Sequence, residues 1–457
     1  MKKFIDTLKN IWKIQELRNR ILYTLGLLLV FRFGSYIVLP GVNAAELAQA
    51  GQSGGNPNDL LGLLNVFTGG AFNKGAIFAL GVMPYITASI IIQLLTFAVP
   101  FFQRLQQKEG ESGRKKISQY TRLLAIPITL VQGGAYLTYL SSQPNVMEPG
   151  LVYWLCNTVV LCTGTIFAMW LGEKITDRGI GNGISFIIMT GIIDALPRAL
   201  ATEFSLKTST SGGILGFILD ILMFIAIVMF TIIIIQGIRK IPIQFAKRMV
   251  GRSGDFMPAA GNRDYIPVKL NASGVMPIIF AQALMFLPMT VGQYLSKSNP
   301  DWATNAFFRA MSDFTSVPYN VVYFFLVVIF TYVYTALIVN PQQYSEYLKR
   351  QNAFIPGIKP GAHTAEFIDT VTTRITLPGS IFLAFIAILP AFSGILNIGS
   401  DFARFFGGTS LLIMIGVILD TLQQIESHLL MRRYDGLVKS GRLKGRGGVG
   451  MQVGANM

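Results

Sequence analysis

Long apolar stretches separated by short polar segments recur along nearly the whole chain. Ten of them contain about 18 or more residues, the length that an α-helix needs to cross the hydrocarbon core of a bilayer. The predicted spans are residues 21–39, 76–100, 120–140, 151–172, 183–201, 214–238, 272–292, 318–339, 375–396 and 408–430. The pattern therefore predicts an all-α polytopic membrane protein with ten transmembrane helices.

One apolar segment, residues 60–72, is too short to cross a membrane. It reads Leu-Leu-Gly-Leu-Leu-Asn-Val-Phe-Thr-Gly-Gly-Ala-Phe, about half the length of a spanning helix. Two interpretations are open: a short helix on the outer surface, or a half-helix that re-enters the protein. The second requires that the irregular backbone at Gly69 and Gly70 be buried in protein or line a cavity.

The composition agrees with a membrane protein and excludes an ordinary soluble one. Hydrophobic residues make up 52% of the 457 residues and charged residues 13%, whereas soluble domains are about 25% charged. The spans leave enough chain for loops but not for a separate soluble domain. Cys156 and Cys162 lie in one apolar stretch and favour packing over a disulfide, and His363 and His428 lack metal-ligand spacing.

The net charge of +15 is distributed unevenly along the chain. Of the 38 Lys and Arg residues, 31 lie in segments that the ten spans place on one side of the membrane. Because positively charged loops remain in the cytoplasm, both termini are predicted to be cytoplasmic. Residues 1–20 are amphipathic and lack a small-residue cleavage site, so we expect them to be retained. Residues 431–457 form a basic, Gly-rich tail.

A short sequence occurs twice, once in the second predicted span and once in the seventh. Residues 81–88 and 274–281 both read Gly-Val-Met-Pro and agree at six of eight positions. Five spans separate the copies, so they run through the membrane in opposite directions, as in two inverted five-helix halves. Chance recurrence of Val, Met and Ile strings is the alternative interpretation.

The inverted repeat suggests a division of the chain. The first half would comprise residues 21–201, including the half-helix at 60–72, and the second half residues 214–430. An external hinge loop at residues 194–213 would join them. Two long cytosolic loops, residues 237–271 and 339–374, would belong to the second half.

Few residues suit catalysis or ion transport. The Gly-rich segment 178–183 follows no predicted strand and lacks the GxGxxG spacing, so a tight turn is favoured over nucleotide binding. Charges within or beside the spans are Arg32, Asp220 and Asp420. Such charges can mark an ion path, but three isolated groups favour structural pairing.

Several longer motifs occur in an order that hydropathy alone does not explain. They are residues 78–95, 108–122, 170–173, 178–185, 354–361 and 407–413. These motifs closely resemble the SecY family of protein-conducting channels, which includes Sec61-alpha. The resemblance covers about residues 20–445 and is weakest in the outer loop at 296–316 and in the tail.

The resemblance implies a ten-helix clamshell around an hourglass pore, which passes unfolded preproteins and releases hydrophobic segments sideways into lipid. An apolar collar would close when empty and deform around a passing chain. Matched to the family's motifs, this pore ring comprises Val82, Ile86, Ile184, Ile188, Ile279 and Ile413. Ile86 and Ile279 occupy the same slot in the two repeats. The family pattern often carries isoleucine at Val82, so we expect a slightly softer collar.

The resemblance also implies a plug and a lateral gate. Residues 60–72 correspond to the plug that blocks the outer funnel at rest; the plug residues are Leu60, Leu61, Leu64, Asn65, Phe67, Gly69 and Gly70. The lateral gate corresponds to Pro84, Thr87, Ile90, Gln93, Asn271 and Pro277. Gly81, Pro84, Gly274 and Pro277 would favour bending of the gate helices, with ordinary membrane-helix kinking as the alternative.

The two long cytosolic loops correspond to the family's docking site for the ribosome and for the motor ATPase SecA. The docking residues are Arg239, Lys240, Lys247, Arg248, Arg252 and Lys359. They could neutralise ribosomal RNA phosphates or acidic groups of the motor, or fix the topology and contact anionic lipids. Lys359 stands where the family pattern carries arginine, so the charge is kept and the bidentate fork is lost.

The sequence therefore predicts a channel subunit of a bacterial plasma (inner) membrane with no catalytic centre and no cofactor. Its expected partners are SecE-like and SecG-like small subunits, SecA, the ribosome and preproteins with signal sequences. SecA, translation or the membrane potential would supply the energy. The alternatives are an ion-coupled secondary transporter, which inverted repeats also suit, and a membrane-embedded transferase, which would need an acidic pair or a metal motif.

Overall fold

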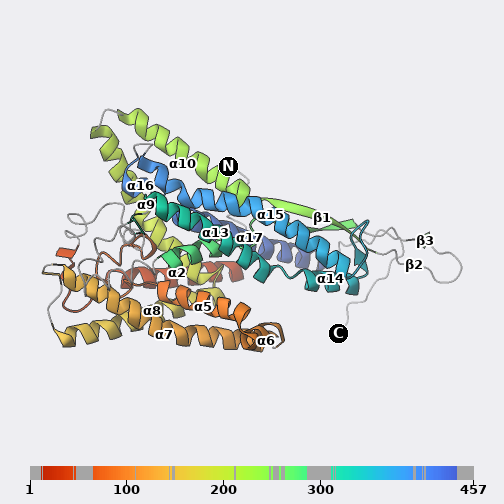
Figure 1. The fold of residues 1–457 in the computed structure, drawn as a ribbon, viewed down its shortest axis with the longest axis horizontal. Coiled ribbons are helices and arrows are strands. Elements are labelled where there is room, and N and C mark those ends of the chain that lie inside the picture. The colour runs from red at the N-terminus through yellow and green to blue at the C-terminus, as the bar shows by residue number, and fades with distance from the viewer. Residues whose placement is uncertain are drawn as a thin grey trace.

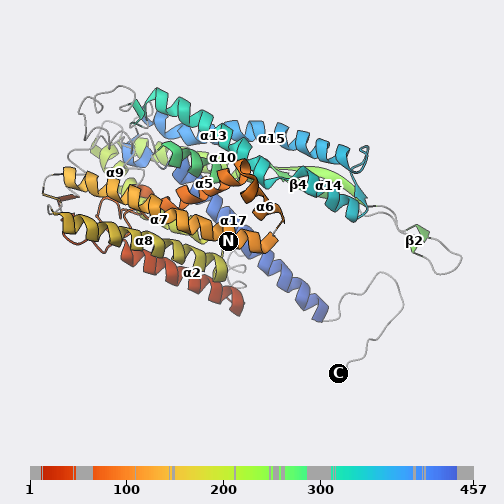
Figure 2. The same ribbon diagram turned by 60° about the horizontal axis from the view of Figure 1, so that its bottom comes forward.

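A computed structural model of the chain shows helices that lie side by side along its long axis (Figure 1). The structure describes residues 12, 14–44, 46–47, 65–108, 110–143, 145–146, 150–209, 213–245, 249–250, 257–258, 263–285, 310–311, 313, 315–394, 398–403, 405 and 408–439. Strands β1 and β4 and helix α14 lie at one end of the bundle in both views (Figures 1 and 2).

Helices make up most of the described residues. The first part of the chain contributes α2 (Gln15–Gly34), α5 (Met83–Ala98), α6 (Pro100–Lys108), α7 (Gly110–Ser142), α8 (Leu151–Arg178) and α9 (Gly183–Ser209). The second part contributes α10 (Gly213–Gln236), an apolar helix at Met276–Met285, α13 (Val317–Ile338), α14 (Pro341–Arg350), α15 (Ala362–Ile388), the 3₁₀ helix η2 (Leu389–Gly394), α16 (Ser400–Ala403) and α17 (Gly408–Lys439).

Each of the ten predicted spans contains a helix. Seven helices among the described residues are long and apolar enough to cross a membrane, namely α7, α8, α9, α10, α13, α15 and α17. The other three are α5, with 16 residues, the shorter helix Met276–Met285, and α2, which begins with the polar residues Gln15 and Glu16. The predicted class, a mostly helical polytopic membrane protein, is confirmed.

The repeated Gly-Val-Met-Pro sequence begins a helix in both of its copies. Gly81 and Gly274 have φ of 53° and 66°, a left-handed conformation that glycine adopts without strain. Helix α5 then begins at Met83 and the helix Met276–Met285 two residues after Gly274, each with proline at its second position. Proline lacks an N–H, which the first helical turn does not need. The motif therefore starts these two helices, at the place near their beginning where the sequence predicted bending.

The connection between α9 and α10 is shorter than the hinge loop predicted at residues 194–213. Helix α9 continues past Pro197 to Ser209, and α10 begins at Gly213. Lys207 near the end of α9 lies 3.0 Å from the Asp220 carboxylate of α10. This buried ion pair holds the last turns of α9 against α10, so the described part of the segment is almost entirely helical.

The two loops predicted to be cytosolic meet in one small folded unit. Strand β1 (Ile238–Phe245) pairs antiparallel with β4 (Arg263–Lys269) and, on its other side, with β5 (Ala353–Phe354) of the second loop. The short strands β2 (Met249–Val250) and β3 (Met257–Pro258) pair beyond them. The buried apolar residues of this unit are Ile241, Ile243, Val268, Leu348, Ala353, Ile355 and Ile368. The otherwise helical chain thus carries a compact hairpin unit, which the all-α prediction lacks.

Candidate pore, plug and lateral gate

The largest apolar cluster of the described residues, named the pore cluster, contains the predicted pore ring. Val82, Ile86, Ile188, Ile279 and Ile413 are buried in it, and Ile184 packs against it. Val82 and Ile86 lie at the start of α5, Ile184 and Ile188 on α9, Ile279 on the helix Met276–Met285, and Ile413 on α17. Branched aliphatic side chains from four separate helices thus belong to one continuous apolar cluster, which also contains many residues outside the predicted ring.

The described end of the predicted plug packs against the same cluster. Leu60, Leu61 and Leu64 lie outside the described residues. Residues 65–67 form one helical turn, and Phe67 is buried in the pore cluster. The Asn65 carbonyl accepts a hydrogen bond from the Gly70 N–H at 2.8 Å, and the Asn65 Oδ1 accepts one from the Asn73 N–H at 3.0 Å. These two bonds close the segment on itself before the chain reaches α5.

Gly69 and Gly191 allow the plug end to approach α9 closely. Gly69 has φ of 63°, which favours glycine. A Cβ atom at Gly191 would lie 2.7 Å from the Phe67 carbonyl oxygen and 2.8 Å from the Gly69 nitrogen, closer than van der Waals contact permits. Glycine at position 191 is therefore required by the backbone of the plug end that lies against it.

Arg32 on α2 connects the plug end to α9. Its Nη1 donates a hydrogen bond to the Gly69 carbonyl at 2.7 Å, and its Nη2 lies 2.5 Å from the Asp194 Oδ1 of α9. The same Nη2 donates to the Tyr36 hydroxyl at 2.8 Å. Arg32 and Asp220 were the two charges near span ends in the sequence, and each has an ion-pair partner, in line with the structural role expected for them.

The predicted gate residues lie on α5 and at the start of the helix Met276–Met285. Pro84 and Thr87 lie in the first two turns of α5, and Ile90 and Gln93 follow on the same helix. Ile90 is buried in the pore cluster. On the other side, Asn271 is buried in the turn before the helix Met276–Met285, where its Nδ2 donates to the Gly274 carbonyl at 2.9 Å. Pro277 is the second residue of that helix.

Two aromatic residues link these helices and were not found from the sequence. Tyr334 of α13 lies beside Gln93 of α5, whose Nε2 donates a hydrogen bond to the Ser89 hydroxyl at 3.2 Å. Its ring also packs edge-on against Phe280 of the helix Met276–Met285, with ring centroids 5.4 Å apart. Tyr334 therefore touches both sides of the predicted gate. Its position in an apolar span, among many other aromatic residues, gives no periodic signal that would mark it.

A buried polar network was also missed. Gln282 of the helix Met276–Met285 accepts a hydrogen bond from the Thr409 hydroxyl of α17 at 2.9 Å, and Thr409 lies 3.0 Å from the Tyr323 hydroxyl of α13. All three residues are buried. A glutamine within an otherwise apolar span is the one sequence feature that could have indicated this network, because a buried amide needs hydrogen-bond partners.

The predicted docking residues that the structure describes lie on the hairpin unit. Arg239 and Lys240 are exposed on β1, and the Lys240 Nζ lies 4.7 Å from the centroid of the Tyr265 ring on β4. Lys359 is exposed in the turn before α15, where its carbonyl accepts a hydrogen bond from the Thr364 hydroxyl. Lys247, Arg248 and Arg252 lie outside the described residues. The hairpin brings charges from both loops to one end of the molecule.

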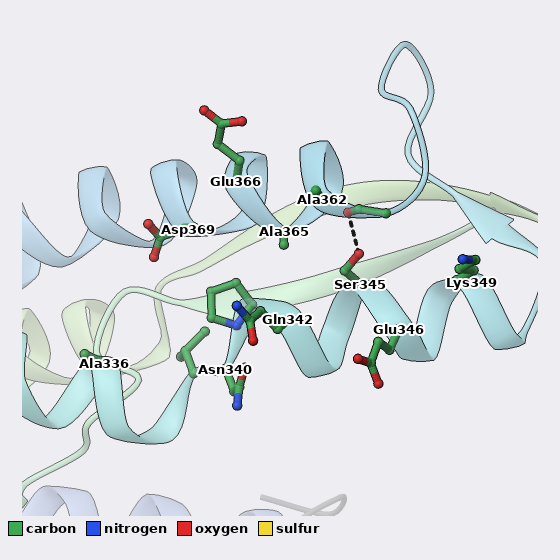
Figure 3. Close-up of a pocket in the computed structure, with 13 residues that line it drawn as sticks. Ala336, Asn340, Gln342, Ser345, Glu346, Lys349, Ala362, Ala365, Glu366 and Asp369 are labelled. Atoms are coloured by element: carbon green, nitrogen blue, oxygen red, sulfur yellow. Dashed lines mark hydrogen bonds between the residues drawn. The ribbon is translucent and has the colours of Figure 1, made fainter. Parts of the chain in front are cut away.

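A groove of about 750 Å³ lies beside this unit, between α14 and α15. Ser345 of α14 donates a hydrogen bond to the Gly361 carbonyl at 2.6 Å, both residues lining the groove, and Glu366 projects from α15 away from α14 (Figure 3). Glu346, Asp369 and Lys349 complete a lining of mixed charge. The lining includes no cluster of metal-binding side chains, and the described residues as a whole contain no such group of three.

The Gly-rich segment at residues 178–183 is tied to neighbouring helices. The Ile180 N–H donates to the Thr24 hydroxyl of α2, and the Gly181 N–H donates to the Gln424 Oε1 of α17 at 2.8 Å. Gly181 has φ of 77°. Backbone donors that would cradle a phosphate are thus already used within the protein, in agreement with a tight structural turn.

The SecY family model matches residues 76–422 of the chain. The protein translocase subunit SecY of Chlamydia trachomatis is 39% identical over 462 residues, which cover 96% of this chain and 99% of that relative. The protein translocase subunit SecY of Escherichia coli K12 is 38% identical over 437 residues, covering 94% and 96% of the two chains.

Solved structures share the fold at much lower sequence identity. A structure described as a protein-conducting channel superimposes with a TM-score of 0.62 at 15% identity, covering 89% of this chain and 91% of that one. A SecY structure described by a plug domain that stabilises the closed channel gives 0.63 at 16% identity with the same coverage. Canine Sec61 in a ribosome-channel complex gives 0.60 at 15% identity, again with 89% and 91% coverage. With the family model and the long relatives, these matches establish that the chain belongs to the SecY family.

Proposed function

We propose that this chain is the protein-conducting channel of a Sec translocase, which passes unfolded preproteins across the membrane and releases apolar segments sideways into lipid. The observation that carries the proposal is the gathering of Val82, Ile86, Ile184, Ile188, Ile279 and Ile413 in one apolar cluster, in a chain that is 38–39% identical to SecY subunits over almost its whole length.

An apolar ring suits a pore that passes polypeptides and blocks ions. An empty constriction lined by aliphatic side chains expels water, so an ion would have to shed its hydration shell to enter. Rotamer changes of Val and Ile let the ring deform around a chain of varying width. No step of this process requires a nucleophile, a metal or a cofactor from the channel subunit itself, and the energy comes from a motor, from translation or from the membrane potential.

The chain is a multi-pass membrane protein, and we assign it ten crossings with both termini in the cytoplasm. The excess of Lys and Arg on one side supports this orientation. The hairpin unit then faces the cytoplasm, where Arg239, Lys240 and Lys359 would contact a ribosome or a SecA-like motor. Similarity to Sec61 in a ribosome-channel complex supports the ribosome as a partner. SecE-like and SecG-like small subunits would complete the complex.

The plug and the gate have defined places in this proposal. Residues 60–72 would block the outer side of the ring at rest, which the burial of Phe67 in the pore cluster supports. The seam between α5 and the helix Met276–Met285 would open towards lipid. Contacts of Tyr334 with Gln93 and with Phe280 would hold that seam shut at rest.

Site-specific photo-crosslinking tests the pore. A photoreactive amino acid at Ile86 is placed in the channel, and a secretory preprotein is stalled halfway through membrane vesicles that contain the complex. We expect crosslinks to the stalled chain from Ile86, and none from a probe at Leu215, which is exposed on the outward face of α10. A preprotein that is protected from protease but does not crosslink to Ile86 would contradict the pore assignment.

A further inference from the structure

Arg32 is placed where a bare charge would be unfavourable. It lies in the last turn of α2, and its side chain is only 22% exposed. Removing a guanidinium from water is costly unless its donors are paired. The partners found are Gly69 of the plug end, Tyr36 of the following turn and Asp194 of α9. The charge is therefore retained within a network that connects three segments far apart in the sequence.

The guanidinium divides its donors between two kinds of partner. Nη2 faces Asp194 and the Tyr36 hydroxyl, both of which lie outside the plug segment. Nη1 faces the Gly69 carbonyl, which belongs to the plug end. The planar fork holds both nitrogens in fixed positions, and the ion pair with Asp194 fixes the fork. Arg32 is thus held by Asp194 of α9, and its Nη1 donates a hydrogen bond to the plug end.

The backbone around Gly69 fits this hydrogen bond. Gly69 adopts φ of 63°, and a Cβ atom there would lie 3.0 Å from the Arg32 Nη1 and 3.0 Å from the Gly191 Cα. The plug end is therefore packed tightly between the Arg32 guanidinium and the α9 backbone, without space for a side chain at Gly69. A charge-assisted hydrogen bond to a carbonyl in this setting is stronger than one between neutral groups.

We infer that Arg32 is a positioning residue that latches the plug in its resting place, by bridging the Gly69 carbonyl to Asp194 of α9. The inference rests on the proposed channel function and specifies how its closed state is held. Displacement of the plug breaks the bond between Arg32 and Gly69, while the ion pair between Arg32 and Asp194 stays intact. The latch therefore releases and re-forms without separating α2 from α9.

Ion conductance of the resting channel measures the latch. The complete complex, with its small membrane subunits, is reconstituted in planar bilayers without preprotein. Loss of one hydrogen bond to a charged donor changes an equilibrium about ten- to a hundredfold, so Arg32→Gln should raise the resting conductance by at least about tenfold. Arg32→Lys keeps the positive charge but loses the planar guanidinium. The resting conductance of this variant should therefore lie between that of the unchanged channel and that of Arg32→Gln.

Two further variants separate the latch from a simple link between α2 and α9. Asp194→Asn weakens that link but leaves the Arg32 donor facing Gly69, so its conductance should rise less than that of Arg32→Gln. Arg198→Gln removes an exposed charge one turn along α9 and should leave the conductance unchanged. Equal leaks from Arg32→Gln and Asp194→Asn would mean that Arg32 only joins the two helices.

Deletion of the plug supplies the decisive comparison. In a channel that lacks residues 60–72, Arg32→Gln should add no further conductance, because its partner is gone. An equal increase with and without the plug would overturn the latch, as would a resting Arg32→Gln channel that is as tight as the unchanged one. Translocation of a normal preprotein by each variant shows that it has folded. If the unchanged complex translocates no preprotein, the channel function itself fails.

Discussion

The seam between α9 and α10 and the seam between α5 and the helix Met276–Met285 are held in different ways. The first contains a buried ionic group: Lys207 lies 3.0 Å from Asp220 and 3.9 Å from Glu203, and the Glu203 Oε2 accepts a hydrogen bond from the Gly399 N–H. The second contains apolar and aromatic contacts, with the neutral pair Tyr334 and Gln93. One seam is ionic and the other is neutral.

The difference has a physical consequence in a membrane. Apolar side chains that separate in lipid meet acyl chains, so no hydrophobic penalty opposes their separation. Separating Lys207 from Asp220 would leave the buried carboxylates of Asp220 and Glu203 without their cation. The ionic seam is therefore expected to stay closed while the neutral seam opens. This expectation agrees with the hinge that the inverted repeat suggested near α9 and α10 and with the gate that the resemblance implied between α5 and the helix Met276–Met285.

The largest effect is expected at the ionic seam. Lys207→Met leaves Glu203 and Asp220 as neighbouring buried carboxylates without a cation, and Glu203 is only 1% exposed. Breaking a buried pair in this way destabilises a protein by about 3–5 kcal/mol. We expect a much lower midpoint in thermal unfolding of the detergent-purified complex. The triple variant Glu203→Gln/Lys207→Met/Asp220→Asn should recover much of the loss, and a Lys207→Met complex of unchanged stability would remove the distinction between the seams.

A smaller effect is expected where the plug end meets α9. Gly191→Ala places a methyl group against the Phe67 carbonyl and the Gly69 nitrogen, and overpacking of this kind costs about 1–3 kcal/mol. Displacement of the plug should raise the ion conductance of the resting complex. Gly26→Ala is the matched control, because nothing lies within 4 Å of a Cβ atom at Gly26 of α2. Equal conductance of the two variants would mean that the plug does not rest on α9.

The neutral seam should respond more weakly. Tyr334→Phe keeps the ring against Phe280 and removes the hydroxyl beside Gln93. Loss of a polar contact worth about 1 kcal/mol would change the open population roughly fivefold. Export of a preprotein with a weakened signal sequence should increase by a similar factor. Tyr344→Phe on α14, where the side chain is exposed, should have no effect. Reduced export by Tyr334→Phe would show that Tyr334 does not restrain the gate.

The smallest effect on stability is expected at the hairpin unit, away from both seams. Lys240→Gln removes an exposed charge and should change the free energy of unfolding by less than about 0.5 kcal/mol. If Lys240 contacts ribosomal RNA, the slope of log binding constant against log salt should decrease by about one unit in ribosome co-sedimentation. Arg198→Gln removes an exposed charge on α9, outside the hairpin unit, and should leave the slope unchanged. An unaltered slope for Lys240→Gln would leave topology as the role of that charge.

The sequence predicted the helical spans well, but not strand β1 or the point at which α9 ends. Long apolar runs have a clear length signal, so every predicted span contains a helix. Strand β1 was missed because Pro242 interrupts it and the segment was interpreted only as a connection between spans. Helix α9 continues to Ser209, beyond the predicted end of the span at residue 201, because Lys207, counted in the sequence as part of a loop, pairs with Asp220 of α10.

The site depended on the family resemblance. Ile86 and Ile188 cannot be distinguished by periodicity from the many other Ile residues of apolar helices. Arg32 was noticed as a charge, but its contact with Gly69 joins segments 37 positions apart and has no local sequence signal. Tyr334 and Gln282 act through contacts between helices, which a single sequence does not record.

The helix start at Gly81 also affects the lipid beside the gate. Because the chain turns there, α5 contains only 16 residues and rises about 24 Å, less than the roughly 30 Å thickness of a hydrocarbon core. Ile91 and Leu94 are exposed on this short helix, and we expect the bilayer beside them to thin locally. A segment that leaves through the proposed gate would therefore enter the membrane beside a short helix, where we expect a thinner hydrophobic barrier.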